Sequence, residues 1–206
     1  MAAAADLDIL AREIAQCRIC VENPISSPLP HEPRPVVQLS STARLCIAGQ
    51  APGARVHESG KPFTDRSGDR LRNWMGIGEV DFYDADKLAI VPMGFCFPGN
   101  DAKGGDLPPR KECAPRWHDA LFSSMPKLEL ILVIGQYAQH WHLQNERSKT
   151  LTETVQNWRN LFDRPGKPTV LPLPHPSWRN SGWLRKNPWF ETDLLPVLKS
   201  EVRRLI

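Results

Sequence analysis

The stretch Arg44-Leu-Cys-Ile-Ala-Gly49 runs directly into Gln50-Ala-Pro-Gly53, so a short apolar run ends in a turn bounded by two glycines. The apolar run is continuous instead of alternating, which is typical of a central strand covered on both faces. Glycine lets the backbone approach a ligand closely, and Pro52 stiffens the turn. This junction therefore predicts a buried strand followed by a ligand-binding loop.

Three further apolar runs of the same kind follow, at Leu88–Met93, Leu128–Ile134 and Thr169–Leu173. Helix-like stretches lie before and between the runs, at residues 6–15, 68–76, 112–125, 136–143, 152–161 and 188–205. Strands that alternate with helices indicate a parallel sheet between two layers of helices. We therefore predict an α/β fold with three layers, α/β/α, and a central four-stranded, mainly parallel sheet.

The composition is that of an ordinary soluble globular protein, with 41% hydrophobic and 24% charged residues. We expect the 206 residues to form a single domain, in which residues 1–40 contribute a helix and a proline-rich loop. No run approaches the roughly 18 consecutive apolar residues of a membrane span, and Met1–Asp6 lacks the basic start of a secretory signal. We therefore expect a cytoplasmic protein, and since nothing indicates an obligate protein partner, a monomer.

The positive charge of the chain is concentrated near its C-terminal end. Residues 175–206 contain six Lys or Arg and three Asp or Glu, which accounts for the whole net charge of +3. A basic patch is what a phosphate backbone requires, because neutralised phosphates release counterions. A solvated helix explains the same charge equally well, so this feature permits nucleic-acid binding without diagnosing it.

Two loops are expected at the same edge of the sheet. The first loop continues through Gly60-Lys-Pro-Phe63 to Asp69. A helix is expected to begin near Ser67, and the free N–H groups at the start of this helix suit an anion or oxyanion. The fourth predicted strand ends in Leu171-Pro-Leu-Pro-His-Pro-Ser177, where a histidine lies between two prolines. Ligands bind outside the carboxyl ends of parallel strands, so the two loops are expected to share one site.

These loops carry a resemblance to a known family. Gly49–Gly53 with Gly60–Phe63 resembles the first motif of the uracil-DNA glycosylase superfamily, in the spacing of its iron-sulfur families 4 and 5, and His175–Ser177 resembles the second motif. The resemblance implies an enzyme that flips uracil out of DNA and hydrolyses the N-glycosidic bond, leaving an abasic site. It also implies uracil-containing DNA as the partner, within the nucleoid of a bacterial cytoplasm.

The resemblance assigns roles around the flipped base. It implies that the backbone of Gln50 and Ala51 holds the uracil carbonyls and that Phe63 stacks on the base, with core packing as the alternative for Phe63. It implies that His175 contacts uracil O2, where negative charge builds as the bond breaks. A donor placed there lowers the barrier by stabilising the anion.

The residues after this histidine are expected to engage DNA. In the resemblance Ser177 binds a phosphate, and Trp178 or Trp183 fills the gap that the flipped base leaves. The basic side chains expected to contact phosphates are Arg179, Arg185 and Lys186.

Four cysteines, Cys17, Cys20, Cys96 and Cys113, match the ligand pattern of families 4 and 5. Four thiolates hold either an iron-sulfur cluster or a zinc ion. The resemblance favours a [4Fe-4S] cluster that ties residues 1–40 onto the sheet, with zinc as the alternative. Disulfides are a poorer interpretation in a cytoplasmic chain, and Cys46, inside the first strand, is expected to be a small buried hydrophobe.

The chain departs from the family pattern at several positions. Ala51 stands where the most familiar branch has the aspartate that handles the attacking water. Asp65 is the candidate to replace it, with helix capping as the other interpretation and Asp69 as a second candidate. An asparagine that pairs with the uracil edge is missing from its usual place, and Asn100 is the candidate to replace it, although a turn explains Asn100 equally well.

The missing acid motivates an alternative function. A protein of the same superfamily that binds uracil or abasic sites without cleaving would not need it. A third class, an iron-sulfur redox or sensing protein, would need labile or open ligation. The loop from Asp101 to Arg110 lacks the histidine of a branch that binds uracil-DNA irreversibly, which favours a turnover enzyme.

Overall fold

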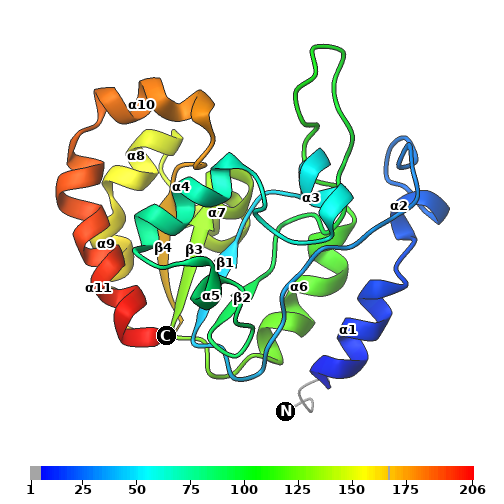
Figure 1. Ribbon diagram of the computed structural model, residues 1–206, viewed down its shortest axis with the longest axis horizontal. Coiled ribbons are helices and arrows are strands. Elements are labelled where there is room, and N and C mark those ends of the chain that lie inside the picture. The colour runs from blue at the N-terminus through cyan, green and yellow to red at the C-terminus, as the bar shows by residue number, and fades with distance from the viewer. Residues whose placement is uncertain (1–5, 167) are drawn as a thin grey trace.

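The computed structural model describes residues 6–166 and 168–206. Its four strands form one sheet: β1 (Leu45–Ala48), β2 (Leu88–Ile90), β3 (Leu130–Ile134) and β4 (Thr169–Leu173). The strand order is β2-β1-β3-β4, and every neighbouring pair is parallel (Figure 1). This confirms the predicted four-stranded sheet. Strand β2 ends before Pro92, which has no N–H to donate to a ladder.

Side chains alternate between two hydrophobic cores, one on each face of the sheet. On one face, Cys46 and Val133 pack with α1 (Leu7–Ala15), α6 (Cys113–Ser123) and α7 (Gly135–Leu143). On the other face, the strand residues Leu45, Ile47, Leu132 and Leu171 pack with α4 (Arg66–Met75), α8 (Leu151–Gln156), α9 (Trp158–Phe162), η3 (Phe190–Leu194) and α11 (Leu195–Leu205). The predicted three-layer α/β/α architecture is therefore confirmed.

The helices differ in detail from the predicted ranges. The stretch expected over 152–161 is two helices that meet at Asn157, and a capping box of Thr150 and Glu153 starts the first of them. The remaining short helices are α2 (Ile19–Glu22), α3 (Ala54–Ser59), α5 (Glu79–Phe82) and α10 (Ser181–Lys186), with 3-10 turns η1 (Gln144–Glu146) and η2 (Trp178–Asn180). Elements of three to six residues are too short to display a hydrophobic period, so the pattern does not predict them.

The proline-rich segment lies across the outer edge of β2. Gln38 forms an antiparallel bridge with Ile90, through N···O distances of 3.0 and 2.7 Å, and the N–H of Val36 donates to the carbonyl of Phe95 at 2.8 Å. Backbone hydrogen bonds therefore attach this segment to the sheet. The prediction that the chain starts without a secretory signal rests mostly on residues 1–5, which lie outside the described residues.

No helix in the described part of the chain combines the length and apolar character needed to cross a membrane. The carboxyl ends of all four strands point to one edge, where three loops rise: the loop after β1, the loop after β4, and a hairpin between β2 and α6. In Figure 1 this hairpin stands upright at the top of the molecule, with α10 to its left. The candidate site lies at this edge.

Candidate functional site

Two adjoining hollows occupy the carboxyl edge of the sheet. The first contains about 550 Å³ of free space, part of which is open solvent at its mouth. Its lining includes Gln50, Ala51, Phe63, Asp65, Asp106 and His175. The second hollow shares several of these residues and adds Ser177, Trp178, Arg179 and Asn180. The structure therefore brings together residues predicted from the two separate loops.

Strand register and one glycine explain this proximity. Strand β3 pairs with β1 on one side and with β4 on the other, so the loops that follow β1 and β4 flank the end of β3. Gly135 lies at that end with a φ of 80°. A Cβ on Gly135 would lie 3.6 Å from Gln50 Oε1 and 3.8 Å from His175 Cβ. A Cβ would therefore only be in van der Waals contact with these two side chains, and the requirement for glycine comes from the left-handed conformation that most residues avoid.

The His175 ring is held in one orientation by its own loop. The N–H of Ser177 donates to His175 Nδ1 at 3.2 Å, and Asn180 Nδ2 donates to the His175 carbonyl at 2.7 Å. Burial lowers the pKa of His175 below its usual value, against the opposing charges of Asp65 and Asp106. A neutral ring whose Nδ1 accepts a hydrogen bond carries its proton on Nε2. His175 is therefore a neutral hydrogen-bond donor at the hollow.

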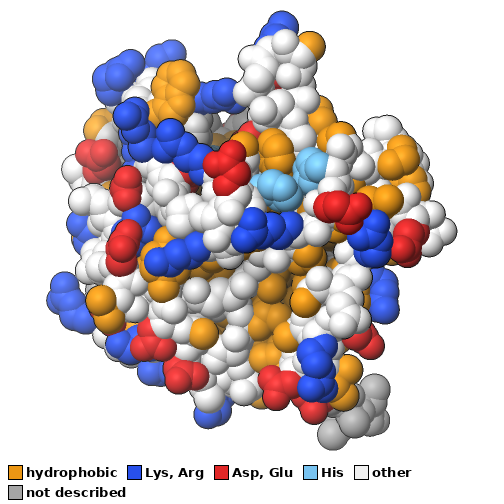
Figure 2. Space-filling model, turned by 45° about the vertical axis from the view of Figure 1, so that its right-hand side comes forward, with side chains coloured by type: hydrophobic (Ala, Val, Ile, Leu, Met, Phe, Trp, Pro, Cys, Tyr) orange, Lys and Arg blue, Asp and Glu red, His pale blue; other side chains and the backbone are white. Residues whose placement is uncertain are grey.

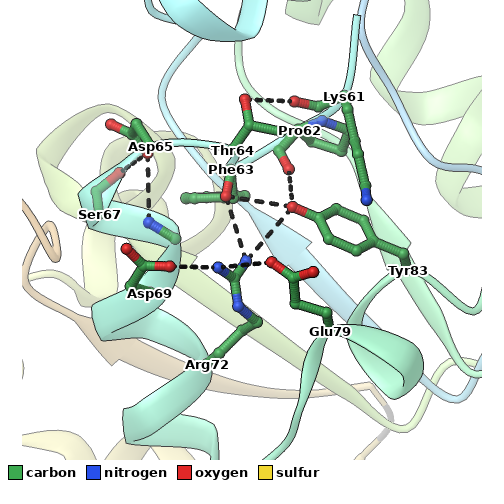
Figure 3. A network of polar contacts seen from close by, with 11 residues as sticks. Lys61, Pro62, Phe63, Thr64, Asp65, Ser67, Asp69, Arg72, Glu79 and Tyr83 are labelled. Atoms are coloured by element: carbon green, nitrogen blue, oxygen red, sulfur yellow. Dashed lines mark hydrogen bonds and ion pairs between the residues drawn. The ribbon is translucent and has the colours of Figure 1, made fainter. Parts of the chain in front are cut away.

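The backbone of Phe63 is fixed in an unusual conformation. Its φ is 55°, in the left-handed region that bulky residues rarely adopt. Figure 3 shows the groups around its carbonyl, which accepts from Arg72 Nη1 at 3.3 Å and from the Tyr83 hydroxyl at 3.3 Å. A Cβ on Gly68 would lie 1.8 Å from this carbonyl oxygen. Strain of this kind persists where surrounding contacts over-determine it, commonly at binding sites.

The arginine in this network is itself held by two carboxylates. Arg72 Nη2 lies 2.6 Å from Asp69 Oδ1 and 3.5 Å from Glu79 Oε1, while the arginine side chain is largely buried (Figure 3). The Tyr83 hydroxyl also donates to the Pro62 carbonyl at 3.0 Å. Asp69, the second candidate to handle the attacking water, therefore forms an ion pair with Arg72 beneath the loop.

The Phe63 ring lies between the hydrophobic core and the first hollow. Its centroid lies 5.9 Å from that of Phe82 in an edge-to-face contact, so part of the ring packs against the core. It is also partly exposed and lines the first hollow, and a Cβ on Gly49 would lie 3.5 Å from the tip of the ring. One edge of the ring is anchored while the ring still borders the space next to Ala51.

The residues after His175 form a compact turn on the rim of the hollow. Ser177 Oγ accepts from the N–H of Arg179 at 3.1 Å, and Arg70 Nη1 donates to the Ser177 carbonyl at 2.9 Å. Trp178 is 70% exposed at the mouth of the second hollow. Such exposure is unusual for a residue that normally buries most of its surface.

The basic residues predicted to contact DNA are placed at different depths. Arg179 lines the second hollow, whereas Arg185 and Lys186 are exposed on α10 and line none of the described hollows. In Figure 2, Lys and Arg side chains gather at the upper left, beside a hollow at the foot of the upright hairpin. Trp183, the other predicted wedge, is partly buried, and its Nε1 donates to Thr152 Oγ1 at 2.8 Å.

The predicted polar residues fall in different places. Asp65 lines the hollow but also caps α4, since its Oδ1 accepts from Ser67 Oγ at 2.6 Å and from the N–H of Gly68 at 3.3 Å. Asn100 is exposed in the hairpin and lines none of the described hollows. Asp106, which the sequence analysis did not select, lines both hollows.

The predicted cysteine ligands converge beneath the hairpin. Cys20 and Cys113 share a hydrogen bond that lowers the pKa of Cys20 to about 7, and Cys17 and Cys20 lie near enough to Cys96 to raise its pKa in addition to the larger effect of burial. Among residues 6–166 and 168–206, no three His, Cys, Asp or Glu side chains are arranged as a ready metal site. Cys46 lies in the core as expected, and burial raises its pKa to about 12.

The surroundings of this group suit thiolate ligands. The buried Nε of Arg110 has no hydrogen-bond partner among the described residues, although the same guanidinium interacts with Cys20 and its Nη2 donates to Glu112 at 2.7 Å. Glu112 also accepts from the N–H of Ile25 at 2.8 Å. A buried N–H without a partner costs free energy unless it meets an acceptor such as a sulfur anion. The residues present therefore fit an all-sulfur iron or zinc site.

Several supporting residues were missed by the sequence analysis. Arg70, Arg72, Asn180 and Asp106 carry no motif of their own, and their contacts become visible only in the folded chain. Asn180 offered a signal: an asparagine in a short loop commonly bonds to a backbone group a few residues away. For the two arginines and for Asp106 the sequence held no comparable signal.

The contact between Gly68 and Phe63 leads to a stability prediction. We expect Gly68→Ala to displace the Phe63 carbonyl from Arg72 and Tyr83 and to lower the free energy of unfolding by about 1–3 kcal/mol, as overpacking does. Urea unfolding would measure the change. Gly182→Ala in α10 is the control, because a Cβ there meets nothing closer than 3.9 Å. Equal stability of Gly68→Ala and the parent would contradict the described packing.

A comparison with protein-family models adds an independent finding. The model described as "Uracil DNA glycosylase superfamily" matches residues 37–199. The matched range includes all four strands and both loops that line the hollows.

Proposed function

The chain belongs to the uracil DNA glycosylase superfamily, and we propose that it removes uracil from DNA by hydrolysing the N-glycosidic bond. The observation that carries this proposal is a neutral, oriented His175 in the same hollow as Phe63 and Ala51. Such a hollow offers an aromatic face for a base and a hydrogen-bond donor for its carbonyl. A base reaches a recess of this kind only when it is extruded from the duplex.

The role of His175 follows from its protonation state. When the sugar–base bond breaks, its electron pair moves onto uracil, and the negative charge is shared with O2. The Nε2–H of His175 donates to that oxygen more strongly as the charge develops, so the contact favours the transition state over bound uracil. A neutral ring whose Nδ1 already accepts from the Ser177 N–H, on a backbone that Asn180 already holds, needs no rearrangement at that moment.

Engagement of DNA is proposed for the rim of the hollow. The exposed Trp178 fills the gap in the base stack, Ser177 and Arg179 contact phosphates next to the lesion, and Arg185 and Lys186 add charge further along α10. The support is the position of Trp178 and Arg179 at the mouth of the second hollow. Backbone contacts hold the duplex in register, and the wedge compensates for the lost stacking.

Excision from 5′-labelled oligonucleotides tests the activity. Single-stranded and duplex substrates carrying uracil or hypoxanthine are incubated with the protein and then treated with alkali, which cuts abasic sites. We expect alkali-dependent cleavage at uracil. A protein that shifts the uracil oligonucleotide without cleaving it would instead be a binding module, the alternative suggested by Ala51 in place of an acid.

A substitution at His175 tests the donor role. We expect His175→Ala to lower the single-turnover cleavage rate about 10²–10³-fold, the cost of losing one donor to a developing anion. Binding to a duplex with uncleavable 2′-fluorinated deoxyuridine should change far less. His140→Ala, at an exposed position on α7, is the matched control. An undiminished rate in His175→Ala would remove this residue from the mechanism.

A pair of substitutions distinguishes the two interpretations of Phe63, stacking on the base and packing in the core. If the ring stacks on uracil, Phe63→Ala and Phe63→Leu should both weaken binding of the fluorinated uracil duplex by about 1–3 kcal/mol, the usual value of base–aromatic stacking. Fluorescence anisotropy against a thymine duplex would measure the difference. Since leucine retains apolar volume beside Phe82, recovery of binding in Phe63→Leu alone would assign the ring to core packing.

We infer that Cys17, Cys20, Cys96 and Cys113 hold a [4Fe-4S] cluster, with zinc as the alternative. The convergence of the thiols and the unpaired Arg110 Nε support this inference. When bound, the cluster would supply a covalent tie between the segment at Cys17 and Cys20, the loop after β2 and the start of α6. The four cysteines thereby keep the hairpin between Cys96 and Cys113 anchored at both ends.

Metal analysis of anaerobically purified protein tests this inference. We expect iron and acid-labile sulfide, about four of each per chain, to be lost in Cys113→Ser and retained in Cys46→Ala. One zinc per chain without sulfide would establish the alternative. Loss of the metal in Cys46→Ala, or no metal in the parent, would contradict the ligand assignment.

A further inference from the structure

The hairpin between Cys96 and Cys113 delivers a carboxylate to the hollow. Asn100 and Asp106 form an antiparallel bridge, and the N–H of Leu107 donates to the carbonyl of Gly99 at 2.9 Å. The turn is closed by Asp101, whose Oδ1 accepts from the N–H groups of Lys103 at 2.8 Å and Gly105 at 2.9 Å. The position of Asp106 is therefore set by the hydrogen bonds within this hairpin.

The base of the hairpin packs closely against the segment that follows β2. A Cβ on Gly94 would lie 3.2 Å from the backbone nitrogen of Arg110 and 3.3 Å from Pro109 Cβ. The Gly94 N–H in turn donates to the Gln50 carbonyl at 3.0 Å. Gly94 therefore contacts both the returning side of the hairpin and the loop after β1.

The Asp106 carboxylate faces the first loop from the opposite side of the hollow. A Cβ on Gly53 would lie 3.5 Å from Asp106 Oδ2, and Asp106 and Ala51 line the same hollow. None of the described residues forms a hydrogen bond or ion pair with the Asp106 side chain. The titratable groups nearest to it are Arg179 on η2, Asp65 at the start of α4, and His175 after β4.

Asp65 differs from Asp106 in how its oxygens are used. The Oδ1 of Asp65 accepts two hydrogen bonds at the start of α4, and a capping carboxylate stabilises the helix in that position. The Asp106 carboxylate is exposed at the mouth, yet nearby groups desolvate it enough to raise its pKa. A raised pKa favours proton acceptance, because a general base works best when its pKa approaches the operating pH.

We propose that Asp106 is the general base of the hydrolysis, supplied by the hairpin in place of the acid that the first loop lacks at Ala51. The proposal rests on the proposed glycosylase function. As the C1′–N1 bond breaks, its electron pair leaves with uracil, which His175 stabilises. The water oxygen bonds to C1′ while Asp106 accepts the water proton, which then passes to solvent as the uracil anion takes up a proton. The products are uracil and an abasic sugar.

Asp106→Asn tests the proposal, because it keeps the shape of the side chain and removes its capacity to accept a proton. We expect the single-turnover rate on uracil duplex to fall at least 10²-fold, the lower end of general-base contributions. The acid limb of the pH–rate profile should also disappear in this variant. Binding of the 2′-fluorinated uracil duplex should stay within a few-fold of the parent, and added formate should partly restore cleavage in Asp106→Ala.

Two further variants test whether Asp106 or another carboxylate acts as the general base. Asp65→Asn should lower the rate less than Asp106→Asn, and Asp163→Asn, at an exposed position that lines neither hollow, should cleave like the parent. If the parent cleaves uracil and the single-turnover rate of Asp106→Asn is within three-fold of the parent rate, the assignment of Asp106 is wrong while the proposed function stands. A parent that cleaves no uracil substrate would overturn the proposed function, and this inference with it.

Discussion

The parallel pairing of β1, β3 and β4 determines the distance between the two loops that form the site. Each strand is buried on both faces, so a shift in register would move two hydrophobic cores at once. Because β3 lies between the other two strands, the loops after β1 and β4 meet over its end, at Gly135. The φ of 80° at that position would strain any residue that carries a Cβ.

The core also supports an unfavourable backbone conformation at the edge. Phe63 remains at positive φ because its carbonyl is held by Arg72 and Tyr83 and has no room to move away from Gly68. Arg72 is in turn neutralised by Asp69 and Glu79 on two different helices. The free energy of this network opposes the strain, and the result is an aromatic ring fixed at the wall of the hollow before any ligand arrives.

The architecture was predictable because continuous apolar runs and helical stretches alternate along the chain, and each signal is local. The loops after β1 and β4 were located for the same reason, since glycine, proline and histidine mark them. Asp106 was not, because its role depends on a hairpin whose direction is set by packing of Pro109 and Arg110 against Gly94. Asn100 shows the converse: its position in the chain suggested the site, but the hairpin turns it to solvent.

The account depends above all on His175 acting as a neutral donor to uracil, and ¹⁵N NMR of the imidazole rings measures this directly. The His175 signals are identified by their loss in His175→Ala. Nε2 is expected to carry the proton at neutral pH, and its N–H resonance is expected to shift when 2′-fluorinated uracil duplex binds but not when thymine duplex binds. A protonated Nδ1, or a His175 resonance that uracil duplex leaves unchanged while binding, would contradict the account.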